Sequence, residues 1–242
     1  MSTTVSARRF ARISSRLPVR NLCADLRRLH RPRGRYRCGM VLKGMMTRPS
    51  GSHRDQLVMA AIALTNLLAP GYSNGVRFTP PADPAETVST ANAVCEHFYR
   101  KQVPFTEDEA ERLLGLAGRL HELLLDLADD DLPTAVPKIN ALLAEFPAQL
   151  HLSSTPPWSL HYQDHSASAV EGWQVGCGAA LASWVSSGAT QYISRCAAVR
   201  CDRVFFDDTR SGTRRFCSPR CQNRDKVRAY RLRQAIANAN AN

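Results

Sequence analysis

The chain has 242 residues, of which 44% are hydrophobic and 22% charged, a composition typical of folded globular proteins and not of fibrous or wholly disordered ones. Its formal net charge of +11 is unevenly distributed. Residues 1–48 carry a net charge of +12, residues 49–194 one of −9, and residues 195–242 one of +8. An acidic body between two basic ends excludes a uniformly basic packing protein and favours local basic surfaces that meet a polyanion.

Hydropathy gives no sign of a membrane span. The longest apolar stretch covers the thirteen residues 57–69, and a membrane helix needs about 20. No apolar run follows the basic N-terminus, so we expect no secretory signal. We therefore expect no membrane partner and a cytoplasmic protein.

Residues 1–56 are rich in Arg, Ser and Pro and show no apolar periodicity. Two interpretations remain open for this basic extension. It is a disordered arm that touches nucleic acid or serves as a transit-like sequence, or translation starts downstream at Met40, Met45 or Met46 and the segment is not made.

Residues 57–190 are predicted to form a helical body. Apolar residues recur there at three- and four-residue spacing, which predicts helices over 57–69, 84–101, 107–128, 133–146 and 167–187. The residues expected to face inward are Val88, Ala91, Val94, Cys95, Phe98, Leu113, Leu116, Leu120, Leu123, Leu124, Leu127, Val136, Ile139, Leu142, Leu143, Phe146, Val170, Trp173, Cys177, Leu181 and Trp184.

Boundary signals support these helices. Asp83 and Pro84 provide an N-cap and a first helical residue, and Thr106 with Glu109 forms a capping box. Gly188 suits a C-cap. The acidic run 129–131 is interpreted as a solvated helix end and not as a metal site.

The connecting segments are predicted separately. We expect a loop over 70–83, a hairpin from 149–152 and 158–163, and a short helix over 189–195. His151, His161 and His165 lie near the hairpin, but they lack the spacing and acid pair of a metal site.

Four of the eight cysteines are clustered near the C-terminus, in the pattern Cys196-x4-Cys201, fifteen residues, then Cys217-x3-Cys221. Two close thiol pairs joined by a hairpin-length spacer are typical of a zinc site, and four thiolates leave no open position for catalysis. Metal binding is favoured over disulfides because no export signal accompanies the cluster. The sequence therefore predicts one structural Zn²⁺ held by these four residues.

The spacer between the two thiol pairs is predicted to be a β-hairpin, with a strand over 204–206, a turn over 207–212 and a return strand over 213–216. Ser218 and Pro219 then begin a helix. Val227 and Tyr230 are expected to pack this helix against the hairpin. The −2 charge of a zinc tetrathiolate offers a simpler role, charge balance, for Arg195, Arg200 and Arg203.

Basic residues accumulate on and before this last helix, where Asp225 is the only acid after Pro219. Such a single-sign helix favours nucleic-acid contact over simple solvation. The candidate nucleic-acid-binding residues are Arg214, Arg215, Arg220, Arg224, Lys226, Arg228 and Arg231.

Residues 195–232 resemble the CGNR zinc-finger domain. The residues that carry the resemblance are Arg195-Cys196-Ala197-Ala198, Cys201-Asp202-Arg203-Val204-Phe205-Phe206-Asp207, Arg214-Arg215-Phe216-Cys217-Ser218 and Cys221-Gln222-Asn223-Arg224-Asp225-Lys226-Val227-Arg228. Gln222 stands where the family usually has Gly. The helix order of 57–190 is more loosely similar to the ABATE domain, which precedes this finger in bacterial proteins described as stress-induced transcription regulators.

The sequence thus predicts a mainly α protein (α+β with a minor β-hairpin). Its parts are the extension 1–56, the ABATE-like domain 57–190, the finger 191–236 and a tail 237–242. The resemblance implies a zinc-dependent DNA-binding regulator of the stress response, whose helical domain dimerises or senses a small-molecule ligand. It also implies a bacterial protein that is associated with the nucleoid when bound to DNA. The alternatives are an RNA-binding zinc ribbon and a protein-interaction module with a purely structural zinc. No phosphate loop, nucleophile elbow or His-Glu metal helix is present, so an enzyme is not expected.

Overall fold

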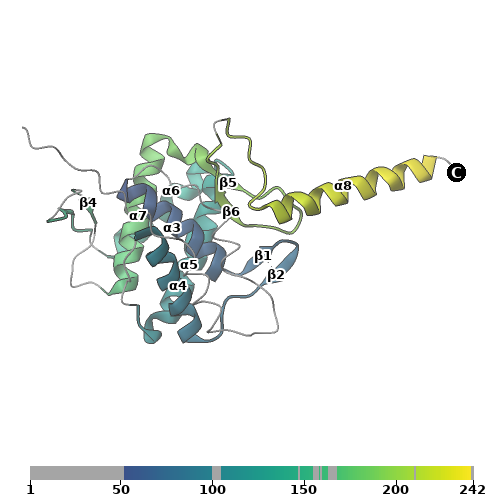
Figure 1. The fold of residues 1–242 in the computed structure, drawn as a ribbon. Helices are drawn as coiled ribbons and strands as arrows, with labels where there is room; N and C mark the ends of the chain where they lie inside the picture. The colour runs from purple at the N-terminus through teal and green to yellow at the C-terminus, as the bar shows by residue number, and fades with distance from the viewer. Residues whose placement is uncertain are drawn as a thin grey trace, which may run out of the picture. The chain divides into compact units, whose positions relative to one another are not determined.

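The structure, a computed structural model, describes residues 52–99, 105–146, 148–154, 158, 160–162, 168–209 and 211–240. Six α-helices and three two-stranded antiparallel sheets occur in these ranges, which confirms the mainly α fold with minor β (Figure 1). Of the predicted basic extension, residues 1–51 lie outside the described residues. Among the described helices, none combines the length and the apolar composition that crossing a membrane requires.

Helix α3 (His53–Leu68) is the centre of the helical body and packs against α4, α5 and α7. It begins four residues earlier than predicted, because Ser52 serves as its N-cap and accepts a hydrogen bond from the Asp55 amide. Leu57 through Leu64 are buried without interruption, so this helix is covered on all sides.

The surrounding helices are α4 (Pro84–Tyr99), α5 (Ala110–Ala128), α6 (Leu132–Glu145) and α7 (Ala169–Ser187). Their predicted boundary signals are present. The Asp83 carboxylate accepts from the Ala85 amide, Glu109 accepts from the Thr106 amide, and Gly188 ends α7 at φ 70°. All six leucines predicted for α5 are buried.

The predicted inward face of α6 is wrong in part. Val136 is 37% exposed, whereas Ala135, Ile139 and Leu142 face the core. The acidic run before α6 forms helix ends: Asp129 caps α5, and the Asp131 side chain accepts from the Thr134 amide. Outside α6, Val88 and Phe98 of α4 are half-buried and not buried as predicted.

The predicted loop over 70–83 contains a small hairpin instead. Strands β1 (Gly71–Ser73) and β2 (Val76–Phe78) pair across Asn74 and Gly75, whose φ angles are 53° and 87°. Two consecutive left-handed residues are what an Asn-Gly hairpin turn requires. The predicted second hairpin is confirmed by β3 (His151–Leu152) and β4 (Leu160–His161).

The third sheet corrects two predictions about the finger. Residues 189–195 are not one helix: a 3-10 turn, η2 (Ala189–Tyr192), leads into strand β5 (Ile193–Arg195). Strand β6 (Val204–Phe206) pairs with β5 and not with residues 213–216. The reason lies in Asp207, whose carboxylate accepts from the amides of Thr209 and Arg214 and thereby holds the following loop in turns.

The last helix, α8 (Pro219–Asn240), begins as predicted, with the Ser218 hydroxyl accepting from the Cys221 amide. It continues through four residues that were predicted to be tail. Val227 and Tyr230 do not pack against the sheet as predicted; they are 49% and 58% exposed. Cys221 is the only buried residue of α8 in its described length.

Candidate metal centre

The four clustered cysteines come from two local structures. Cys196 directly follows strand β5, and Cys201 lies in the turn before β6. Cys217 precedes the N-cap of α8, and Cys221 lies in its first turn. The β5–β6 pairing and the start of α8 thus deliver two thiols each.

The sulfur atoms converge on one point. All four Sγ atoms lie within 4.8 Å of one another. The Sγ separations are 3.8 Å for Cys201–Cys217, 3.7 Å for Cys217–Cys221 and 3.7 Å for Cys201–Cys221. Zn–S bonds of about 2.3 Å in a tetrahedron place sulfurs about 3.8 Å apart, so the spacing fits zinc and is far too long for disulfides.

The environment of the sulfurs also favours a cation. Hydrogen bonds with the thiols of Cys196 and then Cys217 lower the pKa of Cys201 to about 6. The same contacts lower the pKa of Cys221 and raise the pKa of Cys196 and Cys217. Adjacent thiolates repel one another, so the four can all ionise only around a positive ion.

A backbone amide and buried side chains surround the sulfur atoms. The Cys217 amide lies 3.5 Å from Cys196 Sγ and donates to it. Cys196, Cys201 and Cys221 are buried together with Ala198 and Phe205, and Cys217 is partly buried against them, so most of the site is shielded from water. Among the described residues this is the one group of His, Cys, Asp and Glu close enough to hold a metal ion.

Comparison with protein-family models gives the same assignment for this segment. Residues 193–234 match the CGNR zinc finger. The four cysteines of this CGNR finger form the site of one structural zinc ion, as predicted. A comparison of the whole chain with curated proteins found no match.

The CGNR finger is attached to the helical body through strand β6. The Asn66 side chain of α3 donates to the Val204 carbonyl oxygen at 2.7 Å and accepts from the Val204 amide at 3.2 Å. Both residues are buried. The amide side chain therefore pairs with β6 as a neighbouring strand would.

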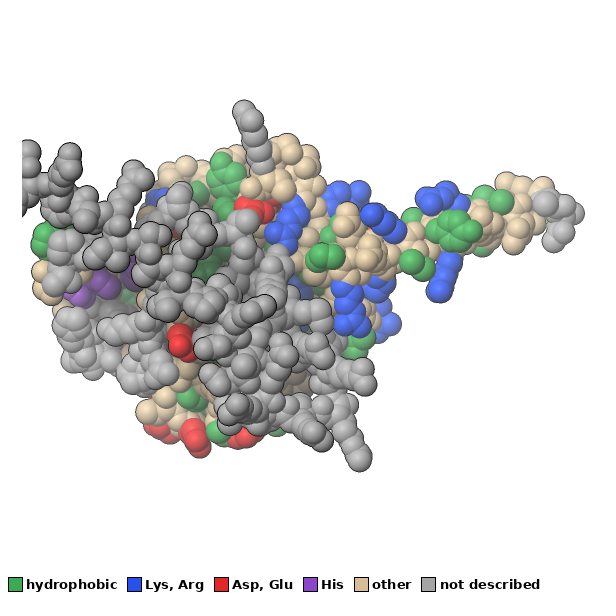
Figure 2. Space-filling view, viewed as in Figure 1, with side chains coloured by type: hydrophobic (Ala, Val, Ile, Leu, Met, Phe, Trp, Pro, Cys, Tyr) green, Lys and Arg blue, Asp and Glu red, His purple; other side chains and the backbone are tan. Residues whose placement is uncertain are grey.

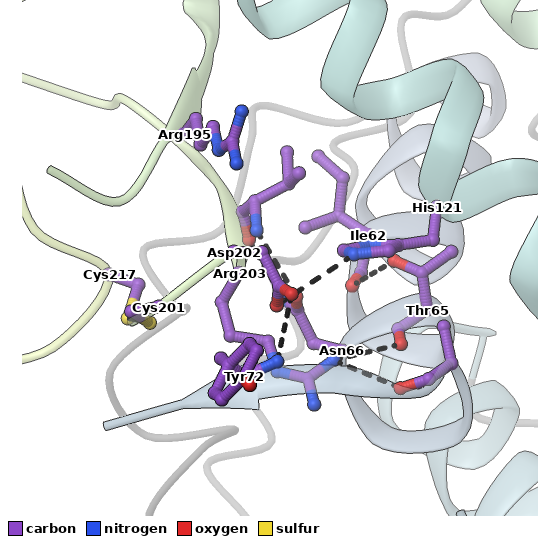
Figure 3. Close-up of polar contacts among 12 residues, drawn as sticks. Ile62, Thr65, Asn66, Tyr72, His121, Arg195, Cys201, Asp202, Arg203 and Cys217 are labelled. Carbon is purple, nitrogen blue, oxygen red and sulfur yellow. Dashed lines mark hydrogen bonds and ion pairs between the residues drawn. The ribbon is translucent and has the colours of Figure 1, made fainter. Parts of the chain in front are cut away.

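Asp202 and Arg203 extend this junction (Figure 3). The Asp202 carboxylate accepts from the Tyr72 amide at 2.8 Å and lies 3.9 Å from Nε2 of His121. Arg203 is 4% exposed and donates to carbonyl oxygens at the end of α3, those of Thr65 and Ala69. Burial lowers the pKa of His121, which favours a neutral ring at this junction.

The arginines considered as charge balance for the metal contact the helical body instead. Arg195 pairs with Asp129 at 3.3 Å. The Arg200 guanidinium lies 5.0 Å from the Tyr72 ring, and the Arg203 guanidinium lies 4.4 Å from the Phe78 ring.

The predicted nucleic-acid residues fall into two groups. Arg214 donates to the carbonyl oxygens of Phe216 and Cys217 and lies over the Phe205 ring, so its guanidinium is committed to the finger. Arg224 donates to the Val199 carbonyl oxygen at 2.5 Å. The remaining candidates are exposed: Arg215, Arg220, Lys226, Arg228 and Arg231.

Two asparagines near the site were not foreseen. Asn66 was taken as part of an apolar helix. The Asn74 carboxamide lies 3.2 Å from Cys221 Sγ and 3.3 Å from the Ser218 hydroxyl. A carboxamide can present nitrogen as well as oxygen, so it can donate to a thiolate there. The sequence signal for this contact was the Asn74-Gly75 dipeptide, a hairpin turn that brings β1 and β2 to the finger.

Proposed function

We propose that this protein is a zinc-dependent, DNA-binding transcriptional regulator of the bacterial stress response, whose finger contacts DNA and whose helical body senses a ligand or dimerises. The observation that carries the proposal is the exposed, basic helix α8 at the zinc site. Of its residues, six are Lys or Arg and one, Asp225, is acidic.

The zinc site gives α8 a fixed starting point. Four thiolates leave no open coordination position, so the ion acts in folding and not in catalysis. It ties Cys221 in the first turn of α8 to the loop after β5 and the turn before β6. A small module with few buried side chains depends on such an ion for its folding free energy.

Most of the charge of α8 is available to a partner, although Arg228 also pairs with Asp225 at 3.3 Å. Arg220, Lys226, Arg228, Arg231 and Arg233 are exposed. Figure 2 shows Lys and Arg side chains in blue around the start of this helix and along it. Neutralising phosphates with such side chains releases condensed counterions, which supplies much of the affinity of DNA-binding proteins.

A salt titration of DNA binding tests the proposal. Zinc-loaded protein and an Arg220→Ala/Arg228→Ala/Arg231→Ala variant are titrated with labelled genomic duplexes at several salt concentrations. Three lost phosphate contacts should reduce the slope of log affinity against log salt by about 2.7. An Arg112→Ala/Arg119→Ala variant on the helical body, which also lowers the net charge, should retain the parent slope.

The same titration with structured RNA and with chelator separates the alternatives. Tighter binding to RNA than to duplex DNA would favour the RNA-binding alternative. Equal DNA binding by the parent and the triple variant would refute the role of α8.

A second candidate function is contact with another protein or a second copy of this chain. It is favoured by Leu232 and Ile236, which are 57% and 52% exposed and four residues apart on α8. Sedimentation of the parent and a Leu232→Ser/Ile236→Ser variant tests it, because a dimer formed through these side chains would dissociate.

A further inference from the structure

Helix α8 carries an uncharged stripe that its packing does not explain. Val227 and Tyr230 are half-exposed, and Asn223 and Gln234 are exposed as well. These four residues follow one another at spacings of 4, 3 and 4. At about 100° per residue they fall within about 60° of the helix circumference, so they form one continuous stripe.

Basic side chains border the stripe on both sides. Arg220, Arg228 and Arg231 lie within about 100° of one edge, and Lys226 and Arg233 lie within about 60° of the other. Figure 2 accordingly shows blue side chains on opposite sides of this helix. The acid Asp225 lies on the far side of the helix, away from the stripe.

The surface between stripe and border is hollowed. A shallow hollow of about 480 Å³ is lined by Asn223, Arg224, Val227, Arg228 and Arg231. It therefore offers one carboxamide and one apolar side chain among three guanidinium groups. The Arg224 guanidinium donates to the Val199 carbonyl oxygen, so this residue anchors the helix. Contact with a ligand then falls to the other residues that line the hollow.

We infer that the stripe Asn223–Val227–Tyr230–Gln234 reads base edges in the major groove of duplex DNA, while its basic borders contact the two phosphate backbones. This inference rests on the proposed function. A major groove about 12 Å wide admits one helix about 10–12 Å in diameter. A bare helix with basic residues on both sides of a neutral stripe matches the charge pattern of that groove, where two phosphate backbones flank the bases.

The chemistry of the stripe indicates which bases it would read. A carboxamide can bond bidentately to N7 and N6 of adenine, which suits Asn223 and Gln234. An apolar side chain contacts the methyl group of thymine, which suits Val227. We therefore expect a binding site in which A·T pairs lie opposite the stripe.

Selection from a random duplex pool tests the inference. The zinc-loaded full chain should enrich a short site containing A·T pairs. Asn223→Ala should reduce the preference for adenine at one position by about 5- to 150-fold, and Val227→Ala should weaken the preference for thymine at a neighbouring position. Arg231→Ala should weaken all sequences alike and change the salt slope by about 0.9.

Matched controls lie outside the stripe. Asn240→Ala removes an exposed carboxamide beyond the end of the stripe, and Val136→Ala removes an exposed apolar side chain from α6. Both variants should keep the parent preference. The inference is overturned if the parent binds DNA without base preference, or if Asn223→Ala and Val227→Ala both keep the parent preference. Either result leaves the proposed function standing. Absence of duplex binding by the zinc-loaded parent would overturn both.

Discussion

Asn66 gives the sharpest test of how the finger is held on the helical body. The substitution Asn66→Ala removes the carboxamide that pairs with both backbone groups of Val204. Val204 is fully buried and Asn66 is 6% exposed, so water does not replace the lost partners without opening the junction.

The magnitude follows from these two hydrogen bonds. A buried donor or acceptor left without a partner costs about 1–3 kcal/mol, so the amide and carbonyl of Val204 together cost about 2–6 kcal/mol. That is a large part of the free energy of unfolding of a typical domain, which is about 5–15 kcal/mol. We expect a lower unfolding midpoint in denaturant and faster zinc release to a chromophoric chelator, because β6 leads directly from Cys201.

Asn92→Ala is a matched control on α4. Its Oδ1 atom is buried and has no hydrogen-bond partner among the described residues, so its loss should leave stability within about 0.5 kcal/mol. Equal unfolding midpoints for Asn66→Ala and the parent would refute the view that this side chain acts as a strand partner for β6.

Three further predictions concern the metal, the β1–β2 turn and pH. Metal analysis of reduced protein should give one zinc per chain, and Cys201→Ser should lose it; metal-free parent protein would contradict the site. Gly75→Ala should destabilise the protein more than Gly188→Ala. Both glycines have positive φ, but a Cβ on Gly75 would meet the Arg224 guanidinium, whereas no atom lies within 4 Å of a Cβ on Gly188. Thermal melts of both variants check this, and equal shifts would contradict it. Burial and the neighbouring His161 lower the pKa of His53 from 6.5 to about 4, so the unfolded state binds more protons between these values. The free energy of unfolding should therefore fall as the pH drops through this window, by about 1–2 kcal/mol after allowance for the half-exposed ring. Denaturation at pH 7 and pH 5 checks this, because the fall in unfolding free energy should be smaller for His53→Gln than for the parent.

The sequence correctly predicted the elements that depend on interactions between residues close together in the chain. The leucines of α5, the capping box at Thr106 and Glu109, and the C-cap at Gly188 depend on spacing and chemistry within a few residues. The zinc ligands were predictable for the same reason, because two short thiol pairs leave few other arrangements.

The errors lie where distant segments decide. Strand β5 was predicted as helix because Ile193 shows its strand character only through its partner Phe206, on the other side of the metal-binding turn. The return strand at 213–216 was expected because hairpins usually pair neighbours, but the Asp207 carboxylate binds the Arg214 amide within that segment and the Thr209 amide within the preceding turn. Val227 and Tyr230 have helical spacing, and spacing alone does not tell whether a surface faces them.

The attachment of the finger gives the proposed regulator a physical connection between its two parts. The β1–β2 hairpin contacts the start of α8 twice: Asn74 lies against Ser218 and Cys221, and Gly75 leaves room for the Arg224 guanidinium. A ligand can shift DNA affinity only if it stabilises one arrangement of α8 over another. A ligand that displaces this hairpin would remove these contacts from the first two turns of α8. The zinc ligand Cys221 and the Arg224–Val199 hydrogen bond would keep the helix on the finger, so the change would be in the position of α8 relative to the helical body. Under the proposed function, a ligand on the helical body would therefore change DNA binding through Asn74 and Gly75, without contacting DNA itself.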